Sequence, residues 1–121
     1  MRESDTMRLI QRELSRNSTR LLRNNIGALY DRDGRMVRYG LGIGTADLIG
    51  VHSMIVTPDM VGKVVGIFTA IEVKADSRAT QAQLDFISLV NQLGGRAGIA
   101  HNVDEARAII DGTALAGMAT P

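Results

Sequence analysis

The feature that most constrains the fold is a nearly continuous apolar run from Val64 to Lys74, which reads Val-Val-Gly-Ile-Phe-Thr-Ala-Ile-Glu-Val-Lys. A run of this kind predicts a central β-strand that is covered on both faces. A covered strand implies a layered arrangement of helices around a sheet. We therefore expect an α/β fold with this strand at its centre.

The segment before this run predicts one helix and three shorter strands. Met7, Ile10 and Leu14 have helical spacing, so we expect an amphipathic helix over residues 5–16. Turn and loop residues divide the segment that follows. Strands are expected over 19–30, with an interruption at Asn24, Asn25 and Gly27; over 36–39, after a turn at 31–34; and over 46–51, after the glycine-rich loop 40–44.

The segment after the run predicts a helix, a strand and a second helix. Residues 79–93 carry an apolar stripe and are followed by Gly94-Gly95, which favours a helix end. A buried strand is expected over 97–101, and a last helix over 103–110 with Asn102 as its N-cap. This order of elements predicts a central mixed sheet flanked by helices.

Length and composition limit the classes of protein that fit. The chain has 121 residues, which suffices for one domain, expected over 1–112 with a flexible tail over 113–121. It has no Cys, which excludes disulfides, thiolate catalysis and cysteine-based zinc sites. No apolar run approaches the roughly 18–20 residues that span a bilayer. We expect a cytoplasmic protein without a membrane partner.

Charge is unevenly distributed, although the net charge is only +1. Residues 1–38 hold nine Arg against five acidic residues, whereas residues 39–76 hold two Lys against four acidic residues. An Arg-rich first third beside an acidic middle suits a polyanion-binding face next to a cation-binding site. The alternative is that the arginines only solvate a helix and a strand.

The charged end of the apolar run carries the candidate chemistry. Glu72 and Lys74 are two residues apart, so on a strand they project from one face, with Val73 pointing into the core. Asp47, at the start of the preceding strand or within it, can approach them if the two strands are neighbours. Two carboxylates and the Val73 carbonyl would suit Mg²⁺ or Mn²⁺, with Lys74 stabilising negative charge. A Glu-x-Lys pair alone could also be a solvated edge or a cross-strand ion pair.

Two other patterns carry no chemistry of this kind. The glycines at 40, 42 and 44 do not form the dinucleotide fingerprint, because Thr45 occupies the last position and a strand follows. His52 and His101 are solitary, so a histidine-ligated metal site has no support. We expect no organic cofactor.

Several short motifs occur in a fixed order along the chain. They are Leu22-Arg-Asn-Asn-Ile-Gly27, Gly44-Thr-Ala-Asp-Leu-Ile-Gly50, Ala70-Ile-Glu-Val-Lys74, Gln83-Leu-Asp-Phe-Ile87 and Gly94-Gly95. Together they resemble the VRR-NUC (virus-type replication–repair nuclease) domain of the PD-(D/E)xK nuclease superfamily. The similarity covers roughly residues 3–110 and departs from the pattern at Ala46, where the superfamily has Pro.

The resemblance implies a restriction-endonuclease-like core and a role for each matched residue. Asp47, Glu72 and Lys74 match the metal-binding and catalytic triad, and Gln83 matches a supporting active-site glutamine. A glutamate on the first helix commonly faces the metal in this family. Glu3 fits the family spacing best, and Glu13 is the alternative.

Candidate nucleic-acid contacts are Arg23, Asn24, Asn25, Arg38 and Arg78. The planar guanidinium of Arg pairs well with phosphate, although any one of these arginines could be an ordinary surface charge. The two asparagines could instead shape a turn.

The resemblance and the acidic cluster predict a Mg²⁺- or Mn²⁺-dependent DNA endonuclease. Stand-alone members of the family are associated with phages and bacteria and resemble junction-resolving enzymes. We therefore expect a homodimer with two metal sites that cuts a four-way (Holliday) junction in a bacterial or phage-infected cell. The alternatives are a flap or general DNA nuclease of the same fold, an RNA-directed nuclease, and a DNA-binding module that has lost activity.

Overall fold

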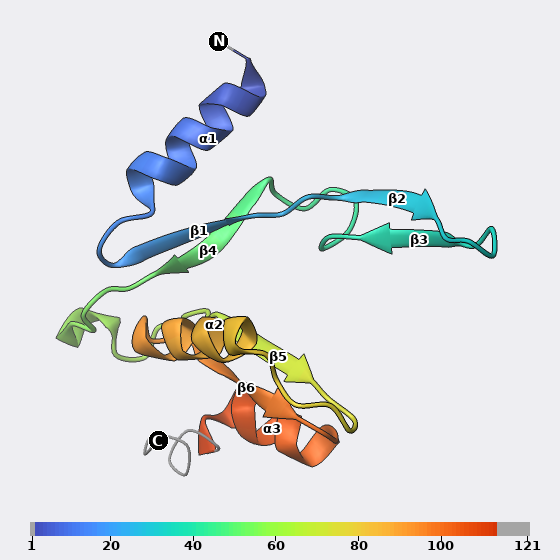
Figure 1. The fold of residues 1–121 in the computed structure, drawn as a ribbon. Coiled ribbons are helices and arrows are strands. Elements are labelled where there is room, and N and C mark those ends of the chain that lie inside the picture. Colours follow the sequence, from blue (N-terminus) through green and yellow to red (C-terminus); the bar gives the residue numbers. More distant parts are fainter. Residues whose placement is uncertain (1, 114–121) are drawn as a thin grey trace. The chain divides into compact units, whose positions relative to one another are not determined.

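The computed structural model describes residues 2–113 and has a mixed α/β fold (Figure 1). Two compact units follow one another in the sequence, divided between His52 and Ser53. We call residues 2–52 the N-terminal unit and residues 53–113 the C-terminal unit. The predicted α/β class is confirmed, and the described strands pair in twos. None of the helices within residues 2–113 is long and apolar enough to cross a membrane.

The N-terminal unit contains one helix and four strands. They are α1 (Glu3–Leu14), β1 (Thr19–Arg23), β2 (Gly27–Tyr30), β3 (Met36–Tyr39) and β4 (Leu48–His52). The helix begins earlier than predicted, because Glu3 and Asp5 place negative charge in its first turn, where the helix dipole favours it. The interruption predicted around residues 24–27 separates β1 from β2.

Strands β1 and β4 pair antiparallel, with Thr19 opposite His52 and Arg23 opposite Leu48. The predicted strand over 46–51 therefore begins two residues late, and Asp47 directly precedes β4. The partner explains the difference, because β1 ends at Arg23, opposite Leu48. Beyond that point the Asn24 N–H donates to the Asp47 carbonyl at 2.8 Å.

Strands β2 and β3 form the predicted hairpin. The Asp31 carboxylate accepts hydrogen bonds from the backbone N–H groups of Asp33 and Arg35, both at 2.9 Å. Gly34 has φ +78°, a conformation that favours glycine. The sequence Asp-Arg-Asp-Gly therefore forms the turn that its composition predicts.

The C-terminal unit contains a 3₁₀ turn, two strands and two helices. They are η1 (Pro58–Met60), β5 (Thr69–Val73), α2 (Gln81–Gln92), β6 (Arg96–Ala100) and α3 (Val103–Asp111). Figure 1 shows α2 and α3 on opposite sides of the parallel β5–β6 pair. Of the predicted tail over 113–121, residues 114–121 lie outside the described part of the chain.

The prediction that the central strand begins at Val64 is wrong. Strand β5 begins at Thr69, and Val64 is fully exposed. The parallel partner β6 has five residues, which pair from Thr69–Arg96 to Val73–Ala100. A strand also needs a hydrogen-bonded partner strand, and β6 pairs with β5 only from Thr69 onward. The apolar residues before Thr69 are therefore not part of the strand.

The core of the C-terminal unit lies between α2 and the β5–β6 pair. Ile87 and Val90 of α2 and Ala97 of β6 are buried, and Phe68, Ala70, Phe86 and Ile99 pack against them. The helix begins at a Thr80 cap and is followed by Gly94 with φ +95°, so the predicted helix over 79–93 is confirmed. The Asn91 side chain accepts from the Ala97 N–H at 2.9 Å and donates to the Ala97 carbonyl at 3.1 Å.

The ends of α3 also follow the sequence. The Asn102 side chain accepts a hydrogen bond from the Glu105 N–H, and Gly112 has the left-handed φ of +79°. A hydrogen bond from the His101 backbone N–H, and to a smaller extent one with the His101 side chain, holds the pKa of the Glu105 carboxyl below its usual range. The predicted N-cap and the predicted end of this helix are both confirmed.

Candidate active site

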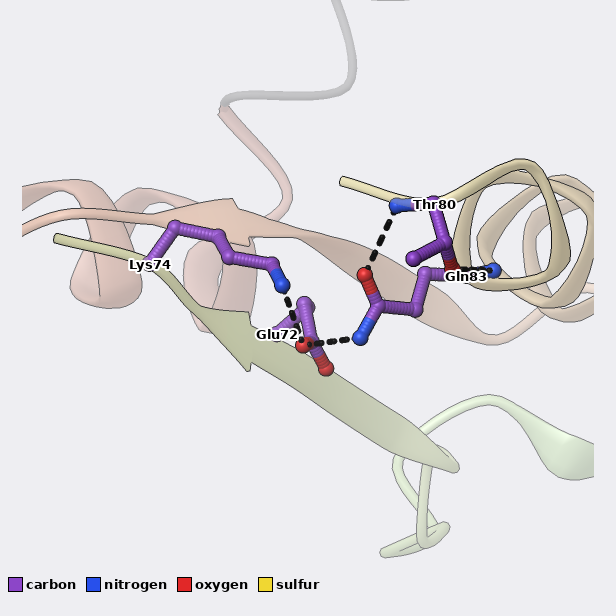
Figure 2. Close-up of polar contacts among 4 residues, drawn as sticks. All are labelled: Glu72, Lys74, Thr80 and Gln83. Carbon is purple, nitrogen blue, oxygen red and sulfur yellow. Dashed lines mark hydrogen bonds and ion pairs between the residues drawn. The ribbon is translucent and has the colours of Figure 1, made fainter. Parts of the chain in front are cut away.

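Three of the predicted site residues meet in the C-terminal unit: Glu72, Lys74 and Gln83, which we call the Glu72 cluster (Figure 2). The Gln83 Nε2 donates to Glu72 Oε1 at 2.6 Å, and the Lys74 Nζ lies 3.5 Å from the same oxygen. The Lys74 side chain is only 14% exposed and that of Glu72 33%, so the ion pair is partly shielded from water. Partial shielding strengthens an ion pair relative to one on an open surface.

The period of two along β5 brings Glu72 and Lys74 to one face, as their spacing predicts. Lys74 follows the last residue of the strand, and its N–H donates to the Ala100 carbonyl at 3.1 Å. This bond continues the β5–β6 pairing by one residue and fixes the backbone from which the ammonium group extends.

The start of α2 fixes the Gln83 amide. Its Oε1 accepts from the Thr80 N–H at 2.9 Å, and the Gln83 N–H donates to Thr80 Oγ1 at 3.1 Å. This reciprocal arrangement is a capping box, and it leaves the Gln83 Nε2 directed at Glu72. Thr80, which the sequence analysis missed, thus positions the Gln83 amide through its backbone N–H. Its signal was present in the Thr-x-x-Gln pattern before the helix.

The Glu72 cluster borders a cavity of about 250 Å³ between β5 and α2. Its lining residues are Ala70, Ile71, Glu72, Ala82, Gln83, Phe86 and Ile87. Both partners of Glu72 contact Oε1, and the hydrogen bonds within residues 2–113 include none to Oε2. The carboxylate therefore has one oxygen held in place and a second available as an acceptor or a metal ligand.

Val73 differs from its prediction in part. The residue is 73% exposed, so the expectation that it points into the core is wrong. The reason is its place at the end of the pair, where Val73 is the last residue of β5 and is opposite Ala100, the last residue of β6.

Asp47 and Glu3 share a pocket of about 210 Å³ in the N-terminal unit. Thr6, Met7, Ile10 and Leu48 complete its lining. Glu13, the alternative to Glu3, lies elsewhere on α1 and is engaged by Arg12 at 3.4 Å and Arg16 at 3.0 Å. Within residues 2–113, no three His, Cys, Asp or Glu side chains form a group that could hold a metal ion.

Asn24 is buried and positions the segment that ends at Asp47. Its Nδ2 donates to Thr45 Oγ1 at 2.8 Å and to the Ala46 carbonyl at 2.9 Å. Its Oδ1 accepts from the Leu41 N–H at 3.0 Å. The side-chain amide is thus occupied at both ends, and it connects the end of β1 to the loop before β4.

The remaining candidate nucleic-acid contacts are exposed. Arg23 lies on β1, Asn25 follows it, Arg38 lies on β3, and Arg78 precedes α2. None of the three arginines forms an ion pair within the described residues, so each guanidinium is accessible to an anion.

The site therefore contains an oriented carboxylate on β5, a shielded ammonium group on the residue directly after β5, and an amide donor on α2. No family model, curated protein or solved structure matches the chain.

The Gln83 amide can be tested apart from its role in the helix cap. Gln83→Ala removes both the cap and the bond to Glu72, whereas Thr80→Ala removes only the threonine half of the cap. We expect each variant to lower the free energy of unfolding by about 1 kcal/mol. Only Gln83→Ala should lower metal affinity or activity, by about 10–100-fold. Calorimetric titration with Mn²⁺ and thermal unfolding of both variants measure the two effects, and equal losses of Mn²⁺ affinity would limit Gln83 to the cap.

Proposed function

We propose that the chain is a metal-dependent endonuclease that hydrolyses phosphodiester bonds in DNA. The observation that carries this proposal is the state of Glu72. One of its oxygens is held by Lys74 and Gln83, and the other makes no hydrogen bond within residues 2–113. An oriented carboxylate beside a lysine suits a reaction in which negative charge increases on a phosphate.

The donor set fits Mg²⁺ or Mn²⁺ in chemical type. The resemblance implies Glu72 and Asp47 as the carboxylate ligands and the Val73 carbonyl and Glu3 as further donors, all of them oxygen groups of the kind that these ions prefer. The pocket that Glu3 shares with Asp47 favours Glu3 over Glu13 for this role. The bound ion would supply a Lewis acid next to the phosphate.

The residues of the chain then have separate roles in the reaction. A water oxygen bonds to phosphorus and releases a proton to solvent, the bond to the 3′-oxygen breaks, and that oxygen takes up a proton from solvent. Lys74 stabilises the charge on the phosphate or orients the attacking water. Gln83 keeps Glu72 in place through the 2.6 Å hydrogen bond.

The finer fold assignment belongs to the same proposal. We infer a restriction-endonuclease-like core in one domain over 1–112, with a central mixed sheet. The resemblance of the ordered motifs to the VRR-NUC domain supports this assignment.

We further propose that the substrate is branched DNA, in particular a four-way junction, and that the chain acts as a homodimer with two active sites. Arg23, Asn25, Arg38 and Arg78 are exposed and would contact the nucleic acid. Asn24 is buried, and we assign it to the positioning of Asp47 instead.

The test compares a labelled four-way junction, a linear duplex of the same sequence, a single strand and an RNA duplex. Each is incubated with Mg²⁺, Mn²⁺ or EDTA. We expect paired cuts in the junction that require the metal. Lys74→Ala should abolish them and Lys63→Ala should not, because Lys63 is the only other lysine and is exposed.

The other outcomes separate the alternatives. Equal cutting of every DNA substrate would indicate a general nuclease, and cutting of RNA alone an RNA-directed one. Binding without cutting would indicate an inactive module. Light scattering measures the mass of the particle, and a 13.0 kDa monomer that still makes paired cuts would contradict the homodimer.

A further inference from the structure

The β2–β3 hairpin is exposed along its length, on both faces. Its apolar side chains are far from buried: Tyr30 is 70% exposed, Leu29 55%, Met36 52%, Tyr39 45% and Val37 43%. A two-stranded hairpin with little apolar burial is marginally stable on its own in water. A binding partner that covers these side chains would therefore stabilise the hairpin, and the chemistry of the side chains indicates which class of partner fits.

The register separates the side chains into two faces. Ala28 is opposite Arg38 and Tyr30 is opposite Met36, so these four share one face. Leu29, Val37 and Tyr39 are on the other, where the Tyr39 ring covers Gly27: a Cβ added to Gly27 would lie 2.2 Å from the Tyr39 hydroxyl oxygen. Tyr39 thus packs within the hairpin, and Tyr30 remains available beside Arg38.

Three arginines lie along the hairpin, from the turn at its tip into β3: Arg32, Arg35 and Arg38. None of them forms an ion pair within the described residues, although two aspartates are nearby in sequence. The Asp31 carboxylate instead accepts two backbone hydrogen bonds within the turn. These two hydrogen bonds fix the turn at the tip, and the Arg32 and Arg35 side chains are exposed to solvent.

We propose that the β2–β3 hairpin binds nucleic acid, with Arg32, Arg35 and Arg38 on phosphates and Tyr30 stacked on an exposed base. Unpaired arginines on a fixed turn are complementary to closely spaced phosphates. An aromatic ring stacks on a base only where the base has an open face, which a continuous duplex does not offer. The hairpin thus favours DNA with a branch or an unpaired base. This inference rests on the proposed function for its choice of DNA.

The test measures binding to a fluorescein-labelled four-way junction and to the matching duplex by anisotropy. The full chain is used in EDTA, so that no substrate is cut. Arg32→Ala and Arg35→Ala are compared with Arg107→Ala, which removes an exposed arginine from α3. We expect each hairpin variant to bind about three- to tenfold more weakly at about 100 mM salt, and to lower the salt slope by about one. Arg107→Ala should bind as the unmodified chain does.

Tyr30 requires its own pair of variants. Tyr30→Ala should weaken binding to the junction by about tenfold or more, with little effect on the duplex, and Tyr30→Phe should retain binding because it keeps the ring. Circular dichroism of every variant checks that the chain is folded. The proposal is overturned if the arginine and Tyr30→Ala variants bind the junction as the unmodified chain does. It is also overturned if they change only the mass of the particle, which would assign the hairpin to contact between two copies.

The two proposals can fail separately. Hairpin-dependent binding without metal-dependent cleavage would reject the nuclease and keep the hairpin assignment. Cleavage that is lost in Lys74→Ala but unaffected by the hairpin variants would reject only the hairpin assignment.

Discussion

Glu72→Gln is expected to lower the rate of DNA cleavage by at least about 100-fold while the chain stays folded. The glutamine has the same shape but no negative charge, so it is a poor ligand for Mg²⁺ or Mn²⁺. It also loses the charge that pairs with Lys74, whose Nζ is 3.5 Å away in the unmodified protein. Single-turnover cleavage of the junction at saturating Mn²⁺ measures the rate, and calorimetric titration measures the loss of metal affinity.

Asp85→Asn is the matched control for this substitution. Asp85 is an exposed carboxylate on α2 and accepts a hydrogen bond from Gln81 at 2.8 Å, so it belongs to the same unit but not to the Glu72 cluster. We expect its cleavage rate to stay within about twofold, as for most surface substitutions. If the Glu72→Gln variant cleaved the junction at the rate of the unmodified chain, Glu72 would have no role in the reaction. An equal loss in both variants would show that the effect is not specific to the cluster.

Asn24→Ala is expected to lower the free energy of unfolding by about 2–4 kcal/mol. The substitution removes three side-chain hydrogen bonds, to Leu41, Thr45 and Ala46. It leaves the Leu41 N–H and the Ala46 carbonyl without the bonds that Asn24 provides. Urea denaturation, followed by circular dichroism, measures the change.

Asn25→Ala provides the control at the next residue. Asn25 is exposed, so its removal should change the free energy of unfolding by less than about 0.5 kcal/mol. If both alanine variants lost the same stability, the network around Asn24 would not carry the effect assigned to it. We also expect Asn24→Ala to reduce cleavage, because the segment that it holds ends at Asp47.

Features set by neighbouring residues could be predicted from the sequence. The Asp31–Gly34 turn, the helix that ends before Gly94 and the Asn102 cap all depend on a few adjacent side chains. The start of β5 could not be predicted in this way. It depends on where β6 begins, because the pairing starts with Thr69 opposite Arg96, in a segment that follows much later in the chain.

In the candidate site, too, features set by neighbouring residues could be predicted, whereas those set by residues distant in the sequence could not. The spacing of Glu72 and Lys74 predicts a shared face, and the structure brings them together with Gln83. The position of Asn24 could not be read from its neighbours, since its hydrogen-bond partners lie 17 to 22 residues later. Nothing in the local sequence distinguishes it from the exposed Asn25, which is the same residue type.

The contact between Asn91 and Ala97 has a consequence for aggregation. In a sheet, the backbone N–H and carbonyl of an edge residue are free to accept a strand from another molecule. At Ala97, which is fully buried, both groups are already bonded to the Asn91 amide. The amide thus substitutes for one residue of a neighbouring strand and blocks intermolecular strand addition at Ala97, the second residue of β6.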